Sequence, residues 1–222
     1  IHLLPHWNWE GREGEITPVY CYTNHPTAEL FVNGKSQGKR TKVKGGDPLD
    51  RFRLRWNEVK YEPGEIKVVV YDIHGQKVGE KVVKTAGKPH HLELYANRGT
   101  GEKVRSYADM YNSCNPSHFS LGGYLNADGE DMAFVAVRVV DKDGNFCPTA
   151  QHQLVMKVEG EGRFKGVCNG DQTSLEVFVN PTMKLFNGEL VVGVQTTKQA
   201  GEMVLKVSGK GVGSATVTLK SK

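Results

Sequence analysis

The dominant feature of this sequence is a series of short β-type runs, each closed by a turn signal, along almost the whole chain. In its first part, the runs rich in β-branched and aromatic residues cover residues 19–23, 28–32, 52–56, 66–72 and 76–85. The turn signals between them are Asn33-Gly34, Gly45-Gly46-Asp47-Pro48, Glu62-Pro63-Gly64 and His74-Gly75. No segment longer than about 10 residues shows a convincing 3.6-residue apolar period, so we expect strands almost throughout.

The pattern pauses at Thr85-Ala86-Gly87-Lys88-Pro89, which has the composition of a linker, and then restarts. The later runs cover residues 91–96, 132–141, 153–158, 162–168, 189–196, 202–208 and 214–219. Runs spaced about 8–12 residues apart are typical of β-sandwiches of immunoglobulin size. A chain of 222 residues has room for two of them. We therefore predict an all-β protein of two tandem immunoglobulin-like β-sandwich domains, residues 1–88 and 89–222.

Two of the turn signals predict β-hairpins. Asn33-Gly34 follows a strand-like run, and Asn-Gly readily takes positive φ at both central turn positions. The segment Asp72-Ile73-His74-Gly75-Gln76 is the second candidate. Residues 99–124 fit the strand pattern worst, because they are polar and too long for an ordinary loop between strands. We expect a surface insertion or a partly ordered excursion there.

The charge distribution bears on the class of partner. The formal net charge is +4, and the excess lies in residues 1–88, much of it between Lys35 and Arg55. A patch this small, without interleaved aromatic residues or a known motif, is not typical of nucleic-acid binding. No apolar run approaches the ~20 residues of a membrane-spanning helix. We expect no nucleic-acid partner and no membrane insertion, and we interpret a chain that begins at Ile1 as a fragment or a processed product.

Cysteine and histidine spacing does not indicate a metal site. Cys21 lies in an alternating strand run and is predicted to be a small buried apolar residue. The other three cysteines allow one disulfide among them, and these are Cys114, Cys147 and Cys168. His90 and His91 are adjacent, and alternation along a strand would point them to opposite faces, so we predict no shared metal. No cofactor is predicted.

The sequence lacks several motifs that carry catalysis. It contains no phosphate-loop, dinucleotide-binding or zinc-protease motif. Residues 126–131 and 141–145 superficially resemble calcium loops, but neither has the register or the distal glutamate of an EF-hand. We interpret both as ordinary Asp- and Gly-containing turns. We predict no catalytic residue in this chain and no enzyme activity by itself.

An aromatic cluster at the start of the chain, His6-Trp7-Asn8-Trp9, is the one unusual constellation. If the segment is extended, both indole rings face the same way and are partly exposed. They could then stack on sugar rings or contact a neighbouring module; alternatively, they anchor the core. Trp56 lies in a strand run and is predicted to be a core residue.

Several segments resemble glycoside hydrolase family 2, the β-galactosidase group. Residues 2–9 resemble the segment that follows the (β/α)₈ barrel in many bacterial members, and residues 28–36 resemble the family's Asn-Gly-Lys hairpin. Residues 64–71 and 83–87 continue the match through that module. The second half is similar to an extra C-terminal module of the family, and the recognisable stretches are 127–131, 139–145, 169–174 and 186–188. Residues 99–124 depart from the family pattern by an insertion of about 25 residues.

The resemblance implies a parent that is a retaining exo-glycosidase, first of all a β-galactosidase, with its two catalytic glutamates on a barrel outside this sequence. Its flanking sandwiches would pack on that barrel and shape the active-site rim, and the parent would be periplasmic or secreted. We therefore predict a non-catalytic accessory region whose contact residues, for the barrel or for carbohydrate, are His6, Trp7, Asn8 and Trp9. Two alternatives are a carbohydrate-binding module, with Tyr20 or Tyr22 added to the platform, and an adhesin-like spacer.

Overall fold

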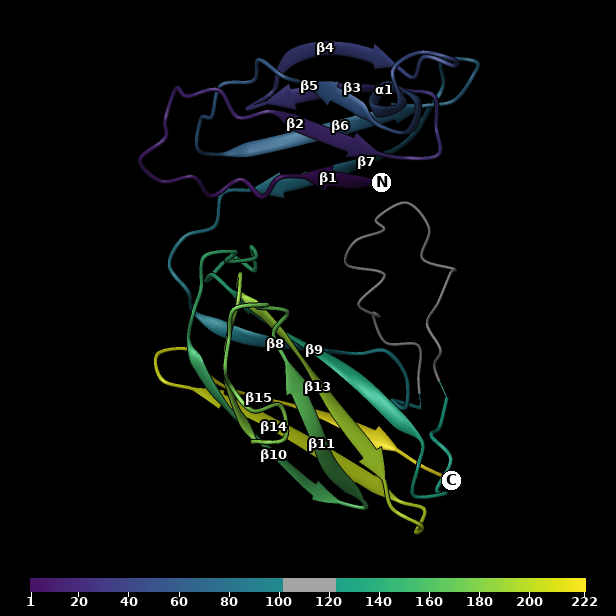
Figure 1. Cartoon of the computed structure of the whole chain (residues 1–222), viewed down its shortest axis with the longest axis vertical. Helices are drawn as coiled ribbons and strands as arrows, with labels where there is room; N and C mark the ends of the chain where they lie inside the picture. The colour runs from purple at the N-terminus through teal and green to yellow at the C-terminus, as the bar shows by residue number, and fades with distance from the viewer. Residues whose placement is uncertain (102–122) are drawn as a thin grey trace. The chain divides into compact units, whose positions relative to one another are not determined.

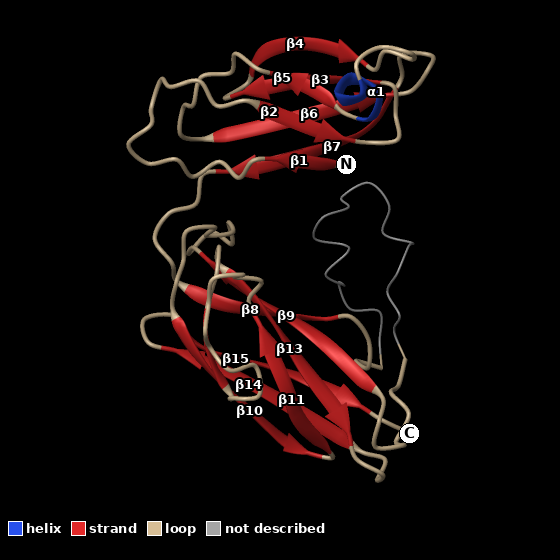
Figure 2. Cartoon of the chain, in the orientation of Figure 1, coloured by secondary structure: helices blue, strands red, loops and turns tan. Residues whose placement is uncertain are grey.

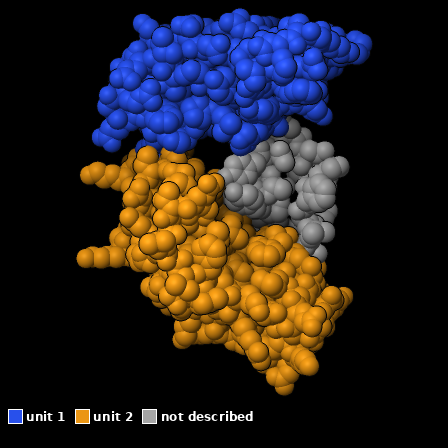
Figure 3. Space-filling view, in the orientation of Figure 1, with its two compact units in different colours: residues 1–86, 111–116 blue, residues 87–110, 117–222 orange. Residues whose placement is uncertain are grey.

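The chain folds into two compact units, each built almost entirely of antiparallel strands (Figures 1 and 2). The computed structural model describes residues 1–101 and 123–222, so most of the predicted insertion lies outside the described residues. The described part of unit 1 comprises residues 1–86, and that of unit 2 comprises residues 87–101 and 123–222 (Figure 3). The boundary falls inside the segment with linker composition. The fold class, two tandem immunoglobulin-like β-sandwiches, is confirmed.

Unit 1 contains two facing sheets. Its elements are β1 (His2–Leu4), β2 (Val19–Tyr22), β3 (Thr27–Val32), β4 (Lys35–Thr41), α1 (Pro48–Phe52), β5 (Leu54–Trp56), β6 (Glu65–Tyr71) and β7 (Lys77–Lys84). One sheet has the order β1-β2-β5 and the other the order β4-β3-β6-β7. If the strands are lettered along the chain, the first sheet is A-B-E and the second C′-C-F-G, which is an immunoglobulin-like arrangement.

Alternation along the strands of unit 1 builds its core. In β3, Ala28, Leu30 and Val32 are buried while the residues between them are partly exposed. The core residues of both sheets pack into one cluster, which includes Leu3, Trp7, Val19, Cys21, Ala28, Leu30, Val32, Leu54, Trp56, Val59, Tyr61, Ile66, Val68 and Val70. The predictions that Cys21 and Trp56 are buried are therefore confirmed.

Unit 2 repeats this architecture. Its strands are β8 (His91–Ala96), β9 (Met132–Val140), β10 (Gln153–Gly160), β11 (Gly162–Cys168), β12 (Thr182–Lys184), β13 (Glu189–Thr196), β14 (Glu202–Gly209) and β15 (Gly213–Lys220). The sheets have the orders β11-β13-β9-β8 and β12-β10-β14-β15. With β12 set aside, the lettered orders are D-E-B-A and C-F-G, as in an immunoglobulin constant-type domain. The alternating apolar residues of β10 and β14 are buried between the sheets.

The predicted strands agree closely with the structure except at residues 52–56, but the sequence pattern does not predict β1, β4 or β12. Both predicted hairpins are confirmed: Asn33 and Gly34 have φ of 47° and 80°, and the backbone N–H of Asp72 donates to Gln76. The predicted strand 52–56 is wrong at its start, because Phe52 ends the short helix α1. Pro48 opens that helix, and the Asp47 carboxylate caps it by accepting from the Leu49 N–H at 2.7 Å. Within the described residues, no helix has the length and apolar character to cross a membrane.

Candidate functional site

The N-terminal aromatic cluster is a structural clamp of unit 1 rather than an open platform. Trp7 is fully buried, packs edge-on against the ring of Tyr61 at 5.1 Å, and donates from Nε1 to the backbone oxygen of Glu62 at 2.8 Å. The predicted partial exposure of Trp7 is wrong, because the chain turns after β1 and directs this ring into the core. Trp7 has no surface left with which to contact a sugar or a barrel.

Asn8 and Trp9 are held by local contacts. The Asn8 carboxamide accepts from the Ala86 N–H at 3.0 Å and donates to the Ala86 oxygen at 2.9 Å. The Trp9 ring stacks on His6 with centroids 4.3 Å apart, and the Arg12 guanidinium lies 5.2 Å from its centroid. The two tryptophans do not share a face. Trp9 and His6 remain partly exposed, and burial lowers the pKa of His6, so its imidazole stays neutral at neutral pH.

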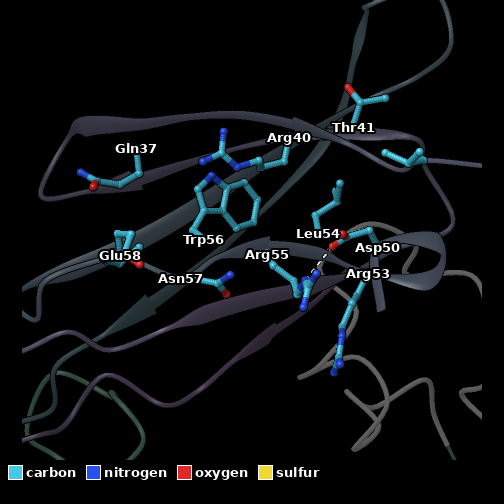
Figure 4. A pocket seen from close by; sticks show the side chains of 12 residues that line it. Gln37, Arg40, Thr41, Asp50, Arg53, Leu54, Arg55, Trp56, Asn57 and Glu58 are labelled. Carbon is cyan, nitrogen blue, oxygen red and sulfur yellow. Dashed lines mark hydrogen bonds and ion pairs between the residues drawn. The ribbon is translucent and has the colours of Figure 1, made fainter. Parts of the chain in front are cut away.

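A more open site lies at one edge of unit 1, between the edge strands β4 and β5 (Figure 4). This hollow, which we call the edge groove, has a volume of about 460 Å³. It is lined by Gln37, Arg40, Thr41, Val43, Asp50, Arg53, Leu54, Arg55, Trp56, Asn57, Glu58 and Val59. Figure 4 shows Gln37 and Arg40 on one side, Arg55 and Asn57 on the other, and the Trp56 indole between them. Trp56 donates from Nε1 to the Gly38 oxygen at 2.9 Å, which ties the two edge strands together.

The cations of the edge groove differ in their partners. Arg55 donates to the Asp50 carboxylate at 2.6 Å, and this hydrogen bond lowers the pKa of Asp50. Arg53 donates to the Tyr22 hydroxyl at 2.7 Å and lies over the Tyr20 ring. Arg40 hydrogen-bonds a backbone oxygen at 3.4 Å and, within the described residues, forms no ion pair. The groove therefore holds two guanidinium groups, Arg40 and Arg53, that form no ion pair with a described carboxylate, and Arg40 is the one without a side-chain partner.

The sequence indicated this groove only in part. The basic segment from Lys35 to Arg55 was visible as a charge pattern, but spacing did not show that it borders a hollow. Gln37 and Asn57 are far apart in the chain and line the same hollow only because β4 and β5 are edges of facing sheets. The sequence pattern does not show which edge strands of the two sheets lie next to each other.

The histidine pair differs from its prediction. His90 Nδ1 and His91 Nδ1 lie 3.0 Å apart, not on opposite faces. The alternation rule fails because β8 begins at His91, which leaves His90 outside the strand. In the parts of the chain that the structure describes, no group of three or more His, Cys, Asp or Glu side chains could hold a metal ion.

The two acidic loops serve as turns. Asp141 is buried, which opposes ionisation, but hydrogen bonds from the Asn145 side chain and from the Gly87, Asn145 and Asp143 backbones lower its pKa to about 2. Asp128 likewise accepts from the backbone N–H groups of Glu130 and Asp131. These carboxylate oxygens stabilise the chain's own turns, in keeping with the turn interpretation of both loops.

Of the cysteines considered for a disulfide, Cys147 and Cys168 are both free, and Cys114 lies outside the described residues. Burial, with a smaller contribution from Asp141, raises the pKa of the Cys147 thiol to about 11. A thiol with so high a pKa is a poor nucleophile at neutral pH. Cys168 is exposed on β11.

Both units match known protein families. Residues 123–218 match the family model described as glycoside hydrolase family 2 C-terminal domain 5, and residues 14–79 match a domain of unknown function, DUF4982. The chain is 35% identical over its whole length to the β-galactosidase BoGH2A of Bacteroides ovatus. It is 26% identical to a β-glucuronidase of Formosa agariphila, again over its whole length.

The fold also matches a solved member of the same family. A glycosyl hydrolase family 2 member from Bacteroides cellulosilyticus aligns with a TM-score of 0.76 at 28% identity, covering 99% of this chain and 24% of that one. The chain covers 22% of the B. ovatus protein and 19% of the F. agariphila protein, so it spans about a fifth of these curated relatives. The resemblance to C-terminal modules of family 2 glycoside hydrolases is confirmed.

Proposed function

We propose that this chain, a pair of sandwiches similar to the C-terminal region of family 2 glycoside hydrolases, is a non-catalytic accessory region of such an enzyme. The observation that carries the proposal is the full-length similarity to one fifth of a β-galactosidase. We assign to the parent the hydrolysis of terminal β-galactosides. The ground is the sequence identity over the whole chain, which is 35% to the B. ovatus β-galactosidase and 26% to the F. agariphila β-glucuronidase. The catalytic carboxylates lie on the parent's barrel, and the parent is periplasmic or secreted.

The role of the region is to support the barrel and its active-site rim. The surfaces we assign to that contact are His6 and Trp9, which are partly exposed beside the clamp formed by Asn8. Trp7 is not part of it, because its ring is fully buried.

A chimeric enzyme tests the supporting role. The matching fifth of the B. ovatus β-galactosidase is replaced by this chain, and a deletion variant of the same enzyme lacks that region entirely. We expect the chimera to hydrolyse p-nitrophenyl β-galactoside and the deletion variant to lose activity or thermal stability. A deletion variant as active and as stable as the intact enzyme would contradict a supporting role and favour a spacer.

The chain alone provides the second test. Purified, it is assayed with p-nitrophenyl β-galactoside and p-nitrophenyl β-glucuronide, and we expect no turnover above buffer. Turnover of either substrate that copurifies with the chain through successive columns would overturn the non-catalytic assignment.

A further inference from the structure

We propose that the edge groove of unit 1 binds an acidic oligosaccharide, with a uronate carboxylate placed against Arg40. Size is the first reason. At about 460 Å³, the groove lies in the range of about 300–1,000 Å³ typical of small-molecule sites. A second hollow of about 220 Å³, lined by Val32, Lys35, Gln37, Glu58, Lys60 and Glu62, shares two of its residues. The two hollows therefore adjoin each other at Gln37 and Glu58, and we call them together the trough.

The polar side chains of the trough match the hydroxyl groups of a sugar. Gln37 and Asn57 present amides that donate and accept, and Glu58 presents a carboxylate that accepts. Asn57 and Glu58 are exposed, and no hydrogen bond to another described residue occupies their side chains. The Trp56 indole already has a partner for its N–H, so it supplies an apolar wall between these groups rather than a donor.

The positive charge around the edge groove favours an acidic ligand. The segment from Lys35 to Arg55 holds eight lysines and arginines and two aspartates. Both aspartates face Arg55, at 2.6 Å from Asp50 and 3.9 Å from Asp47, so they leave Arg40 unneutralised. A guanidinium fork matches a planar carboxylate in a bidentate pair. Arg40 is exposed. The second hollow contributes Lys35 and Lys60 together with Glu58 and Glu62, so its charges balance and the carboxylate of the ligand is assigned to Arg40 alone.

The geometry of β4 favours a saccharide over an acidic peptide. A peptide would add to the free edge of β4 through a regular ladder of backbone hydrogen bonds. The pairing of β4 with β3 shifts register opposite Glu29 and Phe31, and Gly38 within β4 has φ of 89°. Such a bulged edge is a poor template for strand addition. The lining is also mostly polar, without the alternating apolar pockets that peptide side chains use.

Calorimetric titration of the full 222-residue chain with tetragalacturonate tests the proposal. The neutral control ligand is β-1,4-galactotetraose, and the peptide control is tetraglutamate. We expect saturable binding of tetragalacturonate, weakened about tenfold or more in Arg40→Gln, as for loss of a charged hydrogen-bonded pair. Arg51→Gln removes the same charge from α1 without touching the groove, and we expect it to change affinity less than about twofold.

Four results would overturn the proposal. They are no saturable binding of tetragalacturonate, equal binding of the neutral tetrasaccharide, equal binding of tetraglutamate, and equal weakening by Arg40→Gln and Arg51→Gln. The last would indicate diffuse attraction to the basic segment instead of a site. If Arg40→Gln does not fold, Asn57→Ala replaces it, with an expected weakening of about threefold or more from the loss of a neutral hydrogen bond, since that exposed side chain lines the groove.

Discussion

Asn8 and Ala86, 78 residues apart in the chain, are joined by two hydrogen bonds between one carboxamide and both backbone groups of a single residue. Next to this pair, the Thr85 hydroxyl donates to the Trp7 oxygen at 2.5 Å. These contacts fasten the N-terminal segment to the last residues of unit 1. The clamp closes the sandwich at the point where the chain leaves it, which makes it a structural device of this unit.

Asn8→Ala should destabilise unit 1. The substitution leaves the N–H and the oxygen of Ala86 without their partners, and Ala86 is itself buried. We expect a loss of about 1–3 kcal/mol in the free energy of unfolding, measured by urea denaturation. Asn57→Ala is the matched control, because Asn57 is exposed and should change stability by less than about 0.5 kcal/mol. Equal stability of the Asn8→Ala variant and the parent would contradict the clamp.

Trp7→Ala and Trp9→Ala should differ sharply in stability. Trp7 is fully buried against Tyr61, and removing a buried aromatic side chain costs about 3–5 kcal/mol. Trp9 is partly exposed and packs at the margin of the core, so we expect a smaller loss. The measurement is urea denaturation of both variants.

Fluorescence gives an independent check on the same two rings. Acrylamide should quench Trp9 in the folded chain and spare Trp7 and Trp56, which are 0% and 2% exposed. Single-tryptophan variants separate the signals. Ready quenching of Trp7 in a folded sample would contradict its burial and would support the open aromatic platform predicted from the sequence.

Sequence patterns predicted the strands well because alternation is a local property. Runs 91–96, 162–168 and 189–196 coincide with β8, β11 and β13, and turn chemistry placed the Asn33-Gly34 hairpin. The edge groove and the fate of Trp7 depend on which strands face each other. That depends on tertiary packing, which no local spacing encodes. His90 shows the same limit of local patterns. Because β8 begins at His91, His90 lies outside the strand, and the alternation of side chains does not extend to it.

Acid should lower the free energy of unfolding of unit 2, because it protonates the Asp141 carboxylate. The pKa of this carboxyl is 3.8 in its ordinary state and about 2 in the fold, so the folded chain binds the proton less tightly than the unfolded chain. Its contribution is fully present above about pH 4 and is lost as pH falls through about 2. The shift corresponds to about 2 kcal/mol.

Asp141→Asn measures that contribution. We expect the variant to be less stable than the parent by about 2 kcal/mol at pH 6, with the difference shrinking as pH approaches 2. Asp143→Asn, in the same turn but exposed, is the control and should show no such pH-dependent difference. Stability differences that stay constant between pH 6 and pH 2 would assign the effect to packing instead of ionisation.

Gly64 should tolerate substitution far less well than Gly34, although both lie in turns with positive φ. A Cβ at Gly64 would lie 2.1 Å from Asn33 Oδ1, whereas a Cβ at Gly34 would meet nothing within 4 Å. That Asn33 oxygen accepts from the Glu65 N–H at 2.8 Å, so Gly64→Ala disturbs a hydrogen bond as well as the backbone. We expect Gly34→Ala to cost about 1 kcal/mol from its φ alone and Gly64→Ala at least about 2 kcal/mol. Urea denaturation of the two variants makes the comparison, and equal losses would mean that the close approach of the two turns does not stabilise unit 1.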